Sequence, residues 1–359
     1  MTATTTAMDA TLRGFGEVLR QAAADRTPLR IRGGGTKDFY GRPVSGETLA
    51  TGAYRGIVDY EPSELVVTAR AGTPLAELET ALAERGQMLA FEPPHFGDGA
   101  TLGGCVACGL SGPRRAYAGA VRDFVLGVRL LDGRGQDLSF GGRVMKNVAG
   151  YDVARLLTGS LGTLGVITEV SLKVLPLPAA EATLRLELPE ADAIETMNRW
   201  GGKPLPITAT CYADGVLSVR VAGSANGVRA AREKIGGDEV PDGQAFWRGV
   251  REQSHPFFAD AGTLWRLSVK PTAAPISLPG RQFAEWGGAL RWWSTDAPEH
   301  EVRGAAVRAG GHATLFRGDR AGRGVFAPLP PALARIHERL KKAFDPAGIL
   351  NPGLMYPDL

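Results

Sequence analysis

The sequence predicts an α+β protein with two domains, and three observations support this prediction. The chain has 359 residues, more than the roughly 100 to 200 residues of one ordinary domain. The first half is rich in glycine and short strand-like runs, whereas the residues from Thr183 to about Phe316 alternate strands with amphipathic helices. The stretch PLPAAEA, which begins at Pro176, separates the two patterns and is typical of a domain boundary.

These patterns define the expected architecture. We expect a first domain at residues 1–178 and an α+β domain of the ferredoxin-like kind at residues 179–330. A C-terminal helix and tail at residues 331–359 are expected to pack back on the first domain. The second domain is read from the runs TLRLEL, PEADAIETMNRW and ITATCYADGVLSVRVAG.

Individual elements follow from local signals. Leu29–Arg32 and Glu64–Arg70 are expected to be strands, and so are residues 165–175, whose Val166, Val170, Leu172 and Val174 fall on one face before prolines end the pattern. A helix is expected after Thr73 as its N-cap, with Pro74 at the first helical position and Gly86 at its end. The last helix is expected at about residues 331–344.

Composition excludes several classes of protein. Hydrophobic residues make up 44% and charged residues 22%, which is typical of a globular protein and not of a disordered one. The 41 Lys and Arg residues barely outnumber the 38 Asp and Glu residues and are dispersed, so nucleic acid is not an expected partner. There is no apolar run near the ~20 residues of a membrane span and no signal-peptide pattern at the N-terminus, so we expect a cytoplasmic protein.

The three cysteines do not suggest a disulfide framework, because Cys105, Cys108 and Cys211 are an odd number. Cys105 and Cys108 form a C-x-x-C pair without a second pair or a histidine cluster to complete a metal site. A metal or redox role stays open, but we favour small apolar residues packed beside glycines. No metal site is expected.

Three glycine-rich segments suggest an elongated ligand. In Arg32–Lys37 (RGGGTK), consecutive amides without Cβ atoms can wrap a pyrophosphate, and the two end residues add positive charge. A plain turn is the alternative, and the spacing fits neither a Walker loop nor G-x-G-x-x-G. Two more segments, at residues 101–115 and 159–165, allow close approach of a ligand to the backbone.

The order of these motifs resembles the FAD-binding domain of the vanillyl-alcohol oxidase superfamily, the PCMH type. RGGGT at residues 32–36 is similar to its pyrophosphate loop, and TLGG at residues 101–104 and GTLGVITEV at residues 162–170 are similar to its other flavin-contacting segments. KNVAGYD at residues 146–152 and FDPAGILNPG at residues 344–353 recur in its 2-hydroxy-acid dehydrogenase branch.

Within this branch, three further segments resemble the FAD-binding subunits of bacterial glycolate oxidase. They are FEPPHFG at residues 91–97, CGLSGPRR at residues 108–115 and VRDFVLG at residues 121–127. The resemblance implies FAD as the cofactor. By this resemblance the cofactor-binding residues are Arg32, Gly33, Gly34, Gly35, Thr36, Lys37, Pro94, Thr101, Leu102, Gly103, Gly104, Gly109, Ser111, Arg114, Asp123, Gly162, Gly165, Val166, Ile167 and Asn351.

The resemblance also implies a complex that oxidises glycolate to glyoxylate. Its partners would be a sister FAD subunit and an iron–sulfur subunit that receives electrons from flavin, with at most peripheral membrane association through them. Some superfamily members bind FAD covalently through a histidine just after the pyrophosphate glycines. Thr36 and Lys37 occupy that stretch here, so we expect a non-covalent flavin.

No catalytic residue can be assigned from the sequence. The metal segment H-G-D-G-N-x-H of the superfamily's 2-hydroxy-acid dehydrogenases is absent, and the five histidines stand alone. This favours a relay or assembly subunit over a self-sufficient dehydrogenase, such as a D-lactate dehydrogenase, without excluding the latter. Arg266 and Lys270 are candidates for a substrate carboxylate, although both also fit a solvated strand. Arg114 and Arg115 fit either an anion site or an exposed loop.

Overall fold

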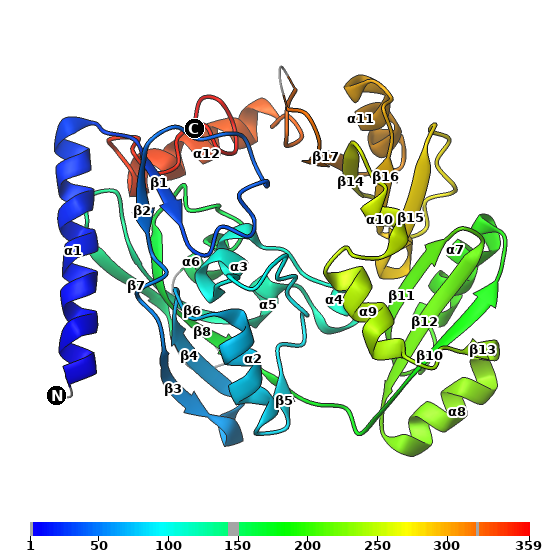
Figure 1. Ribbon diagram of the computed structural model, residues 1–359. Coiled ribbons are helices and arrows are strands. Elements are labelled where there is room, and N and C mark those ends of the chain that lie inside the picture. The colour runs from blue at the N-terminus through cyan, green and yellow to red at the C-terminus, as the bar shows by residue number, and fades with distance from the viewer. Residues whose placement is uncertain (1–2, 143–150, 321–322) are drawn as a thin grey trace.

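The computed structural model of the protein describes residues 3–142, 151–320 and 323–359 and contains two main β-sheets (Figure 1). We call the part around the five-stranded sheet, residues 3–142 and 151–178, the first region. Residues 179–317, around the eight-stranded sheet, are the second region. The strand β9 (Leu175–Pro176), which pairs with β5 (Gln87–Met88) in a small two-stranded sheet, is the last strand before the eight-stranded sheet begins at β10 (Ala180–Glu187). The predicted α+β class is confirmed.

The first region is built on an antiparallel sheet in the order β3-β4-β8-β6-β7. Its central strand β8 is buried at six of its eight residues and contributes Ile167, Val170 and Leu172 to the core of this region, although polar residues alternate with the apolar ones. The elements of this region are α1 (Ala3–Asp25), β1 (Leu29–Arg32), β2 (Glu47–Ala50), β3 (Ile57–Glu61), β4 (Val66–Arg70), α2 (Leu75–Ala83), β5 (Gln87–Met88), α3 (Leu102–Cys108), α4 (Arg115–Ala118), α5 (Val121–Phe124), β6 (Val125–Leu131), β7 (Asp137–Gly141), α6 (Val153–Leu156) and β8 (Val166–Lys173).

The second region carries an eight-stranded sheet in the order β13-β10-β12-β11-β15-β16-β14-β17. Trp292 and Trp293 are adjacent on β16 and therefore face opposite sides of this sheet. Trp293 packs in the core beneath α11, whereas Trp292 faces the first region. The elements are α7 (Glu190–Gly201), β11 (Ile207–Ala213), β12 (Val216–Gly223), α8 (Ala225–Ile235), β13 (Asp238–Glu239), α9 (Gly243–Arg251), α10 (Pro256–Ala259), β14 (Leu264–Ser268), β15 (Arg281–Glu285), β16 (Leu290–Ser294), α11 (Glu299–Arg308) and β17 (His312–Arg317).

The C-terminal segment of the chain returns to the first region. The helix α12 (Pro331–Phe344) begins and ends as the sequence predicts, and it lies over the first region (Figure 1). The tail continues beside β1, where the N–H of Leu29 donates to Ile349 and the N–H of Asn351 donates to Leu29. This contact brings the C-terminal motif to the glycine loop that follows β1.

Two local features differ from the sequence-based predictions, and one predicted motif is only partly described by the structure. The N-terminal helix α1 was not predicted, although Phe15 and Leu19 give it a buried apolar stripe. Thr73 is not a helix N-cap: Pro74 takes that position, and the Thr73 hydroxyl accepts the N–H of Gly56 instead. Most of the KNVAGYD motif, residues 146–150, lies outside the described residues.

Among the described helices, none combines the length and the apolar character needed to cross a bilayer.

Candidate cofactor site

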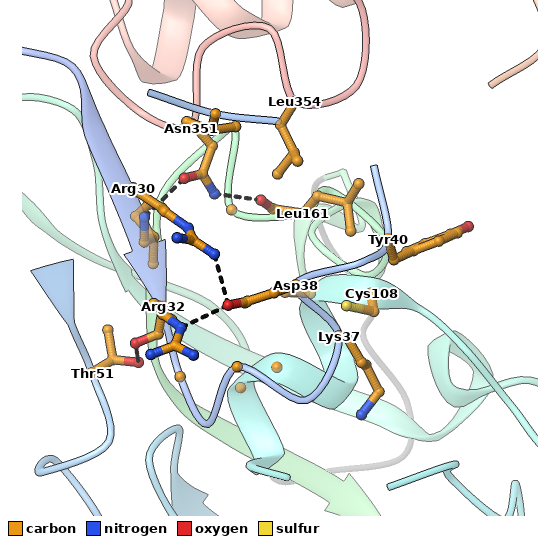
Figure 2. Close-up of a pocket in the computed structure, with 18 of the residues that line it drawn as sticks. Arg30, Arg32, Lys37, Asp38, Tyr40, Thr51, Cys108, Leu161, Asn351 and Leu354 are labelled. Carbon is orange, nitrogen blue, oxygen red and sulfur yellow. Dashed lines mark hydrogen bonds and ion pairs between the residues drawn. The ribbon is translucent and has the colours of Figure 1, made fainter. Parts of the chain in front are cut away.

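A cavity of about 340 Å³ lies where the three glycine-rich segments and the C-terminal tail converge. This volume is in the range of small-molecule and cofactor sites. The walls come from β1 and its following loop, from α3, from residues 161–167 and from the tail at Asn351 and Leu354 (Figure 2). The chain thus brings together segments that are more than 300 residues apart in the sequence.

The first glycine loop is packed tightly against a neighbouring backbone. A Cβ atom on Gly34 would lie 1.4 Å from the carbonyl oxygen of Gly99, so no side chain fits there without moving one of the two segments. Gly35 has a φ of +73°, a conformation that favours glycine. The glycines are therefore required by close packing and by one turn, and all three line the cavity.

The second segment forms the start of α3. The Thr101 hydroxyl accepts the N–H of Gly104 at 3.2 Å and so caps this helix. A Cβ atom on Gly103 would lie 2.7 Å from the Cβ of Ala71, whereas one on Gly104 would meet only the Thr101 hydroxyl within 4 Å. Gly103 is thus needed for packing, and Gly104 faces open space at the cavity wall.

The third segment is fixed from behind by the tail. The side-chain amide of Asn351 donates to the carbonyl of Leu161 at 2.7 Å, and its oxygen accepts the N–H of Ile31 at 2.8 Å (Figure 2). Asn351 is 3% exposed and therefore ties β1 to the 161–163 loop inside the protein. Leu161 and Gly162 both have positive φ values, 53° and 71°.

The charges around the cavity are mostly positive. Asp38 lies between Arg30 and Arg32, with N···O distances of 2.6 and 2.8 Å (Figure 2). Lys37 Nζ donates to the carbonyl of His95 at 3.2 Å. The buried Nε of Arg320 has no hydrogen-bond partner among the described residues, and burial lowers the pKa of this side chain. Such a set of donors suits an anionic group.

The cysteine pair lies beside this cavity. Cys108 lines the wall and Cys105 is buried below it, and both are free thiols. Burial raises the pKa of Cys108 to about 11 and that of Cys105 to about 12, so both stay protonated at neutral pH. Within the described residues, no group of three or more His, Cys, Asp or Glu side chains is placed to hold a metal ion.

The structure brings many of the predicted cofactor-binding residues together. Those on the cavity wall are Arg32, Gly33, Gly34, Gly35, Thr36, Lys37, Thr101, Gly103, Gly104, Gly162, Gly165, Ile167 and Asn351. Other predicted cofactor-binding residues do not line the cavity but have a role in packing or in ending or beginning a helix. Leu102 and Val166 lie in the core, Gly109 ends α3 with a φ of +66°, and Asp123 accepts the N–H of Ala120 at the start of α5.

Arg114 is also away from the cavity. Its guanidinium lies 3.3 Å from Glu92 and 3.5 Å from Glu181, and Arg220 contacts Glu92 at 2.8 Å. Glu92 and Arg114 belong to the first region, whereas Glu181 and Arg220 belong to the second. We call these four residues the junction cluster. Burial by itself would raise the pKa of Glu92, but the two guanidiniums outweigh burial and lower it.

A second, smaller hollow of about 20 Å³ lies between the two regions. This is roughly the space of one water molecule. Its wall includes the predicted residues Pro94 and Ser111, together with Arg266, Glu285 and Trp292 of the second region. Glu285 accepts the indole N–H of Trp292 at 2.7 Å, and burial raises the pKa of Glu285 to about 7. Lys270, the other proposed carboxylate ligand, is exposed and lines neither hollow.

Sequence reasoning missed several residues of the cavity wall. Arg30, Asp38, Tyr40, Arg42 and Arg320 all line it. Arg30 lies just before the glycine loop and Asp38, Tyr40 and Arg42 just after it, so their nearness in sequence could have indicated them. Arg320 lies in the arginine-rich run GDRAGRG, which the sequence shows only as a polar turn.

Comparisons with known proteins agree with this geometry. A family model described as an FAD binding domain matches residues 14–141, which include the first two glycine segments. Glycolate oxidase subunit GlcE of Escherichia coli (strain K12) is 53% identical over 343 residues, covering 96% of this chain and 97% of that protein.

Two further comparisons are more distant. Glycolate oxidase subunit GlcD of Bacillus subtilis (strain 168) is 30% identical over 46% of this chain and 36% of its own. The solved structure of an alkyldihydroxyacetonephosphate synthase aligns with a TM-score of 0.65, covering 94% of this chain and 74% of its own, at 16% identity. At this identity the structural likeness supports the fold alone.

Proposed function

Since this chain belongs to the family of FAD-binding glycolate oxidase subunits represented by GlcE, we propose that it holds FAD non-covalently in the glycine-lined cavity. It is an FAD-dependent oxidoreductase subunit, and FAD supplies the two-electron acceptor when bound. The observation that carries the proposal is the convergence of three glycine segments on one cavity, whose wall also carries an Arg320 Nε with no hydrogen-bond partner among the described residues.

The wall residues divide by what they offer the cofactor. The loop at residues 33–36 presents unobstructed backbone next to Arg32 and Lys37, which suits a pyrophosphate. Tyr40 and Cys108 lie on the wall and belong to the cluster of apolar and aromatic side chains that includes Trp292. An apolar surface of this kind suits a flavin ring, so we propose that the ring points toward the second region.

We further propose that the chain works within a complex that oxidises glycolate to glyoxylate. Its partners are a sister FAD subunit and an iron–sulfur subunit that takes electrons from flavin. The support is the 53% identity to a protein whose name is that of one subunit of glycolate oxidase. In this arrangement the chain's own residues bind and orient FAD, and the substrate is oxidised in the sister subunit.

One observation favours a second candidate, a self-sufficient 2-hydroxy-acid dehydrogenase. Arg266 reaches the small hollow between the regions, close to the apolar end of the cavity, and no ion pair holds it among the described residues. A guanidinium in this position suits a carboxylate. Glu285, with its pKa near 7, lies on the same wall and could accept a proton.

A turnover assay separates the two candidates. The purified chain, loaded with FAD, is incubated with glycolate or D-lactate and an artificial electron acceptor. The relay proposal predicts no turnover by the chain alone and turnover when the partner subunits are added. Turnover by the chain alone that is lost in Arg266→Met but kept in Lys270→Met would favour the dehydrogenase and contradict the relay proposal.

A further inference from the structure

The helix α12 carries a buried cation that is not part of the cavity wall. Lys341 is the only buried residue of this helix, and it is 8% exposed. Its ammonium donates to the carbonyls of Thr163 at 2.9 Å and Leu350 at 2.6 Å, and it lies 2.9 Å from Asp345. All three donors of the ammonium are therefore used.

Asp345 completes this arrangement. It is 1% exposed, and its two carboxylate oxygens accept the N–H groups of Ile349 at 3.1 Å and Leu350 at 2.7 Å. The ion pair thus fixes the tail at residues 349–351, and Asn351 at its end holds the carbonyl of Leu161. A single buried pair reaches the 161–163 loop twice, directly through Lys341 and indirectly through Asn351.

The two contacts fix the direction of loop amides as well as carbonyls. In a trans peptide the N–H points opposite to the C=O of the preceding residue. Holding the carbonyls of Leu161 and Thr163 therefore also sets the N–H groups of Gly162 and Leu164. The loop carries two successive residues with positive φ, so it would otherwise have other conformations available.

We propose that Lys341 is a positioning residue of the FAD site, which holds residues 161–163 in their cofactor-binding shape before FAD arrives. Lys341 lines a separate hollow behind this loop and is absent from the cavity wall. Its effect on FAD must therefore pass through the loop. The inference rests on the placement of FAD in the cavity proposed above.

The test compares two buried cations that both hold backbone carbonyls. Arg291 is the matched control, because it is 0% exposed, contacts the carbonyls of Ala273 and Ala274, and lies in the second region away from the cavity. Lys341→Met and Arg291→Met are each prepared without FAD. The Kd for FAD is measured by flavin fluorescence, and the melting temperature of each apoprotein is recorded.

Both variants are expected to lower the melting temperature of the apoprotein, but only Lys341→Met should raise the Kd, by about tenfold, because the loop must then be ordered at the expense of binding. Lys341→Arg, which keeps the cation, should recover part of the affinity. An unchanged Kd in Lys341→Met would overturn the proposal. If Gly104→Leu, which fills the cavity, also left the Kd unchanged, the placement of FAD would have failed instead.

A second measurement needs no variant. In and just before this loop, the N–H groups of Gly159 and Leu161 donate to the carbonyls of Val106 and Ala107 in α3, and the N–H of Thr163 donates to the carbonyl of Ser160. If the loop is ordered in advance, hydrogen exchange of these amides in the wild-type apoprotein is far slower than in the urea-unfolded chain. Exchange at the unfolded rate in the absence of FAD would contradict the proposal even if both variants failed to fold.

Discussion

The cavity and the junction cluster both contain arginines, but they use them differently. At the junction, Arg114 and Arg220 are paired with Glu92 and Glu181 and are almost fully buried. At the cavity, Arg320 keeps an unpartnered buried Nε within the described structure. A charge that is already neutralised inside the protein serves packing, whereas one left open at a hollow is available to a ligand.

Filling the cavity is expected to have the largest effect, the loss of bound FAD, and so tests the cavity side of this comparison. Gly104→Leu should abolish FAD retention, because the new side chain would occupy space next to the cofactor, while the helix α3 gains a better helix former. Gly14→Leu in α1 is the control, because a Cβ atom there meets nothing within 4 Å and Gly14 lies away from the cavity. Absorbance at flavin wavelengths after purification gives the answer. A Gly104→Leu protein that stays yellow would show that FAD does not bind in this cavity.

The next effect concerns stability at the junction. Arg114→Ala should lower the free energy of unfolding by about 3 kcal/mol, because it leaves the largely buried carboxylates of Glu92 and Glu181 with one partner fewer. Thermal denaturation of the apoprotein measures this loss, with Glu187→Gln on the exposed side of β10 as a control. The Kd for FAD should stay within about twofold of wild type. A large rise in the Kd with little loss of stability would instead indicate that Arg114 contacts the cofactor.

Arg32→Ala should give the opposite result. Its pair with Asp38 is exposed, so the melting temperature should change little. The Kd for FAD should rise about tenfold, because a charge-assisted contact to the pyrophosphate is lost. Titration of the apoprotein with FAD measures this. The contrast between cavity and junction would fail if Arg32→Ala and Arg114→Ala changed the same quantity.

The smallest expected effect is a pH dependence from the second hollow. Burial raises the pKa of Glu285 from 4.5 to about 7, so the folded protein binds a proton that the unfolded chain has lost between these pH values. The contribution to stability, about 3 kcal/mol at most, is complete below pH 4.5 and lost as the pH rises through 7. Glu285→Gln should therefore flatten the fall in melting temperature between pH 5 and pH 8. If the melting temperature fell with pH as steeply in Glu285→Gln as in the wild type, a group other than Glu285 would be responsible.

The fold could be predicted from the sequence wherever local pattern and packing agree. The strand β8, with its apolar face, and the limits of α12 follow from periodicity and from proline and glycine signals. The helix α1 was missed, although Leu12, Phe15 and Leu19 carry a helical spacing, because the threonine-rich start concealed it. The N-cap at Thr73 was wrong because its hydroxyl makes a tertiary contact with Gly56 that no local signal reveals.

The site could be predicted only in part, for a similar physical reason. The glycine segments are contiguous in sequence, so their presence on the cavity wall follows from local conformation. Whether Arg114 faces a ligand or Glu181 depends on residues far away in the chain, and no spacing encodes it. The close packing of Gly34 against Gly99 likewise shows that this glycine is needed for backbone contact, not for unusual backbone angles.

The most direct test of the central claim is an absorbance spectrum of the purified chain before and after denaturation in acid, followed by filtration. The account predicts flavin absorbance in the native protein and free FAD in the filtrate, because neither Thr36 nor Lys37 offers the histidine linkage of covalent members. Flavin that stays with the denatured polypeptide would contradict non-covalent binding. A colourless chain that takes up no added FAD would contradict the assignment of the cavity itself.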